Sequence, residues 1–114
     1  MSIDDYERMI ELLKSTTLSG KLEWEYNNSM GRFYTYINEC KVELQMYYDA
    51  SMQDNKASLN LFNKNGQLFA SYYYYSQVDG EDYRKLRELE DLVRDNYYKI
   101  TESENLILKG LENL

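Results

Sequence analysis

The amino-acid sequence predicts an α+β fold built on an antiparallel meander of about five strands, in the order α-β-β-β-β-β-α-α. One N-terminal and two C-terminal helices are expected to pack on one face of the sheet. Three observations support this expectation. Apolar residues recur with helical spacing near both ends of the chain, they alternate with polar residues in between, and the length of 114 residues is that of one ordinary domain. Residues 1–114 are therefore expected to form a single domain.

The first helix is predicted over residues 3 to 15. Ser2 precedes it as an N-cap, and Asp4 and Asp5 lie near the positive end of the helix dipole. The residues that would form its apolar face are Ile3, Tyr6, Ile10 and Leu13.

The central part of the chain alternates as half-buried strands do, with every second residue apolar. A first strand is expected over residues 21–26, and the stretch 27–31 reads as a turn. The dipeptide Asn65-Gly66 is a strong hairpin signal. The side chains expected on the core-facing side are Leu22, Trp24, Tyr26, Phe33, Thr35, Ile37, Val42, Leu44, Met46, Tyr48, Leu59, Leu61, Leu68, Ala70, Tyr72 and Tyr74.

Three hairpin registers can be tested against one another. Tyr26 opposite Phe33, Ile37 opposite Val42, and Leu61 opposite Ala70 all keep the same apolar set on one face. The second of these registers sets Tyr34 opposite Gln45, and the third sets Phe62 opposite Phe69. This agreement among the three hairpins favours the meander.

Two helices are expected after the sheet. Asp79 with Asp82 reads as a cap for a helix that reaches about residue 99. The stretch 101–104 (Thr-Glu-Ser-Glu) has the form of a capping box, which predicts a short last helix with Ile107, Leu111 and Leu114 on its apolar side.

The residues that alternate with the core set form an outer sheet face rich in aromatic side chains. Three interpretations compete. The aromatics could stabilise the sheet through cross-strand pairs, bind a protein partner or a second copy, or stack single-stranded nucleic acid. Nearby Glu23, Glu25 and Glu43 disfavour direct nucleic-acid binding. The residues predicted to bind a partner are Tyr34, Tyr36, Tyr47, Phe62, Phe69, Tyr73 and Tyr75.

The sequence offers little catalytic chemistry. It has no histidine, one cysteine (Cys40), and five glycines scattered singly, which removes His-based triads, His metal sites and glycine-rich phosphate loops. We therefore expect no enzyme activity, no catalytic residue, no cofactor and no metal. The alternative is a small hydrolase that uses carboxylates, with Glu23 and Glu25 as the nearest pair on one strand face.

The net charge and the expected cellular compartment further limit the classes of function that the sequence supports. The net charge is −7, and the sequence shows neither a signal peptide nor a membrane span, so we expect a cytoplasmic protein with no membrane partner. In size, acidity and α+β make-up the chain is similar to small phage inhibitors that imitate DNA and to toxin-neutralising immunity proteins. No motif carries this likeness. The expected function is a non-enzymatic intracellular binding protein of inhibitor or immunity type, acting through the tyrosine-rich sheet face or the acidic helices. An acidic DNA mimic that occupies a nucleic-acid-binding groove is a further alternative.

Overall fold

The computed structural model describes all 114 residues and contains two helices and one five-stranded antiparallel sheet. The strand order is β1-β2-β3-β4-β5, so each strand pairs with its neighbour in sequence, and the predicted meander is confirmed. The elements are α1 (Ile3–Leu18), β1 (Glu25–Asn27), β2 (Arg32–Ile37), β3 (Cys40–Asp49), β4 (Asp54–Phe62), β5 (Leu68–Tyr75) and α2 (Gly80–Glu112).

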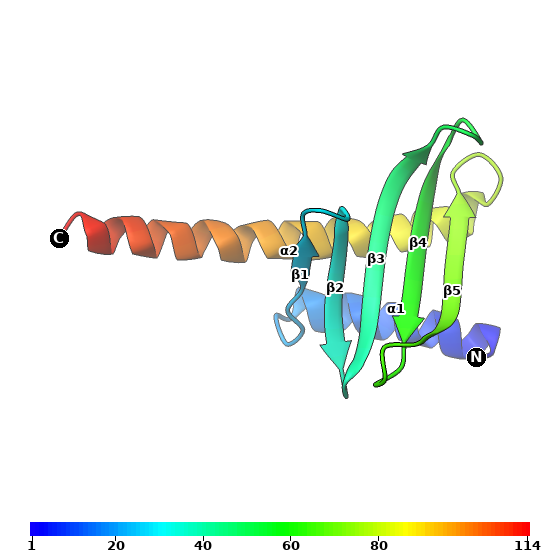
Figure 1. Ribbon diagram of the computed structural model, residues 1–114, viewed down its shortest axis with the longest axis horizontal. Helices are drawn as coiled ribbons and strands as arrows, with labels where there is room; N and C mark the ends of the chain where they lie inside the picture. Colours follow the sequence, from blue (N-terminus) through cyan, green and yellow to red (C-terminus); the bar gives the residue numbers. More distant parts are fainter.

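Both helices lie on the same side of the sheet and cross its strands, which leaves the opposite face open (Figure 1). The core fills the space between the helices and the sheet. The buried apolar side chains are Ile10, Leu13, Trp24, Phe33, Val42, Leu44, Ala57, Leu59, Leu61, Tyr83, Leu86, Leu89 and Val93. The predicted division of strand residues into a core-facing and an outward-facing set thus holds through the centre of the sheet. It fails near the strand ends, where Ile37, Tyr48 and Leu68, expected on the core-facing side, are 40%, 61% and 56% exposed.

Helix α1 begins as predicted, with the Asp5 amide donating to the Ser2 hydroxyl at 3.1 Å. It ends three residues later than predicted. The Thr16 hydroxyl donates to the Leu12 carbonyl at 2.6 Å, and buried Thr17 accepts the Trp24 indole N–H at 2.9 Å. These bonds hold the last turn in the helix and against the sheet.

Strand β1 is shorter than the predicted span of 21–26. The Leu22 amide bonds to the Thr16 carbonyl at the end of α1, which ties this residue to the helix and not to β2. Trp24 lies outside the strand yet is buried at 5% exposure. The Thr35 hydroxyl donates to the Glu23 carbonyl at 2.8 Å, so a side chain takes the place of a ladder bond here.

The β1–β2 register, with Tyr26 opposite Phe33, is confirmed. The predicted β2–β3 register is wrong by two residues, because Ile37 pairs with Cys40 and not with Val42. Asn38 and Glu39 both have positive φ values, of 48° and 68°, and form a tight two-residue turn. A shift of two residues leaves every side chain on its predicted face.

The β4–β5 register is confirmed at Leu61 opposite Ala70, but Phe62 pairs with Leu68 and not with Phe69. A bulge beside Phe62 causes this difference. The predicted two-residue turn at Asn65-Gly66 is replaced by a longer loop. The Asn63 side chain organises that loop by accepting from the Asn65 and Gln67 amides, both at 3.0 Å.

The prediction of two C-terminal helices is wrong, because residues 80–112 form one continuous helix. Thr101 stays within it by donating its hydroxyl to the Tyr97 carbonyl at 2.9 Å. Asp79 is the N-cap residue of this helix, as predicted, but its side chain makes no capping hydrogen bond. Its carboxylate accepts instead from the Tyr75 amide at 2.9 Å. The second half of α2 extends beyond β1 (Figure 1), and residues 102–114 are all exposed. Among them are Ile107, Leu111 and Leu114, which were expected on an apolar side.

Candidate functional site: the open sheet face

The seven aromatic residues predicted to bind a partner come from β2, β3, β4 and β5. Tyr36, Phe69 and Tyr73 are 60%, 58% and 56% exposed, and Tyr47 is also exposed. Tyr34, Phe62 and Tyr75 are half-buried. The register places six of the seven in two groups at opposite ends of the open face, and exposed Phe69 stands at the bulge.

The first group, here called the Lys41 cluster, consists of Tyr34, Tyr36, Lys41 and Phe62. The Lys41 ammonium lies 5.0 Å from the Tyr34 ring centroid and 5.5 Å from that of Phe62. The Tyr34 and Tyr36 rings meet edge to face at 6.1 Å. A cation held over ring faces attracts their π electrons, so the lysine orders the aromatic side chains around it.

The second group, here called the Lys56 cluster, consists of Tyr47, Lys56, Tyr73 and Tyr75. The Lys56 ammonium lies 4.5 Å from the Tyr73 ring centroid, 5.6 Å from that of Tyr47 and 5.7 Å from that of Tyr75. The Tyr75 hydroxyl donates to the Asp49 carboxylate at 2.9 Å. This hydrogen bond raises the pKa of Tyr75, and a hydrogen bond with Tyr47 raises the pKa of Lys56. Lys56 is therefore a cation, and Tyr75 a neutral donor, at neutral pH.

A polar row separates the two clusters. Glu43, Asn60 and Ser71 lie opposite one another on neighbouring strands, and the Ser71 hydroxyl donates to the Asn60 side-chain oxygen at 2.6 Å. Glu43 is only 5% exposed, accepts a hydrogen bond from Arg32 at 2.9 Å and forms an ion pair with Lys41 at 3.3 Å. Tyr34 lies opposite Glu43, which corrects the expected pairing with Gln45.

Three cations of this face, Arg32, Lys41 and Lys56, were missed by the reading of the sequence. Strand alternation contains the signal for them, because each has the same parity as an outward aromatic residue on its own strand, namely Tyr34 for Arg32, Tyr47 for Lys41 and Phe62 for Lys56. Their three charges offset most of the charge of the four acids on this face, which are Glu25, Glu43, Asp49 and Asp54. The open face is therefore aromatic and close to neutral, not divided into an aromatic part and an acidic part.

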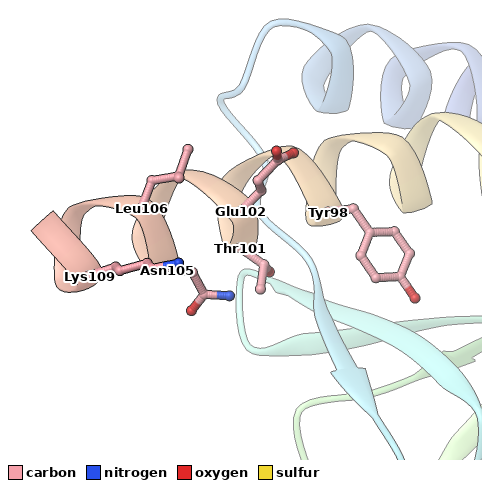
Figure 2. Close-up of a pocket in the computed structure, with 6 residues that line it drawn as sticks. All are labelled: Tyr98, Thr101, Glu102, Asn105, Leu106 and Lys109. Atoms are coloured by element: carbon pink, nitrogen blue, oxygen red, sulfur yellow. The ribbon is translucent and has the colours of Figure 1, made fainter.

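A recess beside α2 does not resemble a ligand site. Figure 2 shows its six lining residues, and all of them belong to the extension of α2. Its volume is about 360 Å³, and its walls are successive turns of one helix. No second element contributes a polar group to it, so it is a surface groove. The lining residues are Tyr98, Thr101, Glu102, Asn105, Leu106 and Lys109.

A second recess of about 310 Å³ lies between α2 and the β3–β4 hairpin and contains a buried acid, Glu90. Burial raises the pKa of the Glu90 carboxyl, while Arg94, which donates to it at 2.5 Å, acts in the opposite direction. The other two buried acids, Glu43 and Asp54, are held by different partners elsewhere. Glu23 and Glu25, the pair considered for hydrolysis, are both exposed. The three buried carboxylates, Glu43, Asp54 and Glu90, therefore do not pair with one another.

The raised pKa of Glu90 leads to a prediction about pH. The folded state holds this proton more tightly than the unfolded state, so stability is lost as the pH rises above the ordinary pKa of 4.5. Glu90→Gln is therefore expected to raise the free energy of unfolding at pH 7. The amide can still accept from Arg94. Urea unfolding at a series of pH values should show this gain shrinking toward zero below pH 4.5. A gain that persists unchanged in acid would contradict the assignment.

No family model matches the chain, and neither a curated protein nor a solved structure is significantly similar to it. Neither helix is long and apolar enough to cross a membrane. No three acidic, cysteine or histidine side chains come together in a way that could hold a metal ion. The geometry of the open sheet face is therefore the basis for a functional assignment.

Proposed function

We propose that this chain is a non-enzymatic, intracellular protein-binding domain that docks its partner on the open sheet face, in the manner of an inhibitor or immunity protein. One observation carries the proposal. Two lysine-centred aromatic clusters project from a sheet face that no helix covers, while the other face of the same sheet is sealed by both helices (Figure 1).

The composition of this face suits a protein partner. Tyrosine provides a large apolar area and a polar hydroxyl group at little cost in rotamer entropy. Aromatic residues are also enriched among the side chains that contribute most of the binding free energy at protein interfaces. Tyr36 and Tyr73 are more than half exposed, although each belongs to a cluster that restrains it. A prearranged side chain loses less entropy on binding.

The chemistry between the clusters also favours a protein over single-stranded nucleic acid. Glu43 forms ion pairs with Arg32 and Lys41, and Asp49 is near enough to Lys56 to contribute to its raised pKa. Phosphate binding needs free basic groups. An aromatic face with balanced charge and a satisfied polar row matches the composition of protein interfaces more closely.

The helices support the DNA-mimic alternative less well, because many of their acids are paired. Lys14 bonds to Glu88 at 3.4 Å and links α1 to α2, and Lys85 lies 3.7 Å from Glu7. Arg84 lies within 4.0 Å of both Glu81 and Glu88. A surface that imitates a phosphate backbone would present its anions without such cations.

The test is to locate the partner contact on the protein. A photo-reactive amino acid placed at position 36 or 73 of the full chain should cross-link to a specific protein in the source cells. The same probe at Tyr98, which is 57% exposed on α2, is the matched control and should not. Equal capture from position 98 would place the contact elsewhere and contradict the proposal.

The partner identified in this way allows a quantitative prediction. Tyr34→Ala, Tyr36→Ala and Tyr73→Ala together should weaken binding at least about a hundredfold, because aromatic anchors commonly contribute 2 kcal/mol or more each. Circular dichroism should show a folded protein. Unchanged affinity would refute the docking role. Loss of folding at room temperature would mean that these tyrosines stabilise the sheet and are not available for docking.

A further inference from the structure

Strand β5 leaves one edge of the sheet open. It pairs with β4 on one side, and nothing in the sheet order pairs with it on the other (Figure 1). An eight-residue edge presents a row of N–H and C=O groups to solvent, which is a template for adding another strand. The opposite edge, β1, has only three residues and carries Glu25.

The direction of the backbone groups along β5 follows from one hydrogen bond. The Ser76 amide donates to the Asn55 carbonyl at 3.0 Å, and residues of an antiparallel strand face alternate neighbours. The backbone groups of Tyr74, Tyr72 and Ala70 therefore point toward β4, and those of Tyr75, Tyr73 and Ser71 point outward.

The outward groups of Tyr75 already have partners within the chain. Its amide donates to the Asp79 carboxylate at 2.9 Å, and its carbonyl accepts from the Asp79 amide at 2.8 Å. Asp79 thus closes the C-terminal end of the edge. Ser71 and Tyr73, in the middle of the strand, keep theirs available to a second strand.

The usual protection of an edge strand is missing from the middle of β5. Edges are commonly blocked by lysine or other charges, by proline, or by bulges. Charged residues make up 29% of the chain, yet residues 65–78 contain none, and the chain has no proline. The bulge lies at the N-terminal end of β5, beside Phe62. The central residues are therefore free to accept another strand.

We propose that β5 pairs antiparallel with β5 of a second copy of this chain, about a two-fold axis at Tyr72, to form one continuous ten-stranded sheet. The side chains fit in this register. Small Ser71 lies opposite Tyr73 of the partner subunit, small Ala70 opposite the partner's Tyr74, and Phe69 opposite the partner's Tyr75. Neither strand carries a charged residue, so no like charges lie opposite one another across the junction.

This inference is independent of the docking function, because it uses backbone groups at the edge and not the aromatic face. It has a consequence for that face all the same. Edge pairing would set the Lys56 clusters of the two copies on the same side of one sheet, where Tyr73 stands close to the two-fold axis. The tyrosine platform would then be continuous across the dimer.

The experiment measures the mass of the full chain by sedimentation over a wide concentration range. The wild-type protein should shift from monomer to dimer as its concentration rises. Ser71→Pro removes an outward N–H without removing a bond to β4, so it should weaken dimerisation at least about tenfold. Ser71→Lys adds a charge to the same edge and should act in the same direction. The matched control is Tyr36→Lys, which adds a charge to the open face on an interior strand and should leave the dimer intact.

Hydrogen exchange of the wild-type protein provides a second readout that does not depend on whether the variants fold. The Ser71 and Tyr73 amides should exchange more slowly at concentrations where the dimer is populated. A monomer at every concentration overturns the proposal. So does a dimer that both Ser71 variants leave unchanged, or one in which these two amides still exchange as fast as in the monomer. A dimer lost in Tyr36→Lys but kept in the Ser71 variants would place the contact on the open face instead.

Discussion

Leu59→Ala is expected to lower the free energy of unfolding by about 2–5 kcal/mol, the range for deleting a fully buried leucine side chain. Leu59 has 0% exposure and lies between Leu44 of β3 and Tyr72 of β5. Leu86 and Leu89 of α2 belong to the same core cluster. The neighbouring strands and helix hold the cavity open, so little of the lost contact can be recovered. Urea unfolding followed through the single buried tryptophan, Trp24, measures the change.

The matched control replaces an aromatic residue on the other face of the sheet. Tyr36→Ala removes a larger side chain, but one that is 60% exposed, and should cost less than about 1 kcal/mol. The contrast between the two variants tests whether the outward face is open. Equal destabilisation would mean that Tyr36 is covered in solution, and the proposed docking face would be lost.

Side-chain parity was the most predictable feature of the fold. The predicted register, with Ile37 opposite Val42, also sets Thr35 opposite Leu44. The structure pairs Thr35 with Val42, yet both arrangements put Thr35, Val42 and Leu44 in the core. A strand repeats every two residues, so a register error of two leaves each side chain on its face. The alternating pattern therefore predicts the core and the open face more securely than it predicts which residues lie opposite one another.

The exact registers depend on turn geometry that residue type only weakly indicates. Glu39 adopts a positive φ of 68°, a conformation that glycine and asparagine favour. A glutamate at this position therefore does not indicate a two-residue turn. Asn63 was not identified as the organiser of the β4–β5 loop, although its side chain accepts two backbone amides there. Both turns depend on local hydrogen bonds and dihedral angles that the pattern of apolar residues does not contain.

The helical break at residue 101 was predicted from a motif with two possible uses. A threonine can cap a new helix, or it can donate to the carbonyl one turn back and remain inside an existing one. The second applies, because Thr101 bonds to Tyr97 and no glycine or proline interrupts the helix before Gly110. Lys41 and Lys56 were not among the residues predicted to bind a partner, although the same alternation places them on the open face.

Removing both cations that hold Glu43 is expected to destabilise the protein more than removing Glu43 itself. The Glu43 side chain is 7% exposed, whereas those of Arg32 and Lys41 are each 29% exposed. A lysine or arginine that loses its partner here can turn toward water, but the carboxylate cannot. Arg32→Ala with Lys41→Ala should therefore cost about 3 kcal/mol, the lower end for an uncompensated buried charge, because both cations are partly solvated.

The control for this double variant is a third substitution, Glu43→Leu. In the wild-type background it removes an ion pair from a nearly buried position and supplies apolar area instead, so its cost should be below about 1 kcal/mol. Added to the double variant, it removes the stranded carboxylate and should restore most of the lost stability, which urea unfolding of all four proteins would reveal. A triple variant no more stable than the double would show that the lost stability comes from other contacts, such as those of Lys41 with the Tyr34 and Phe62 rings, and not from the charge of Glu43.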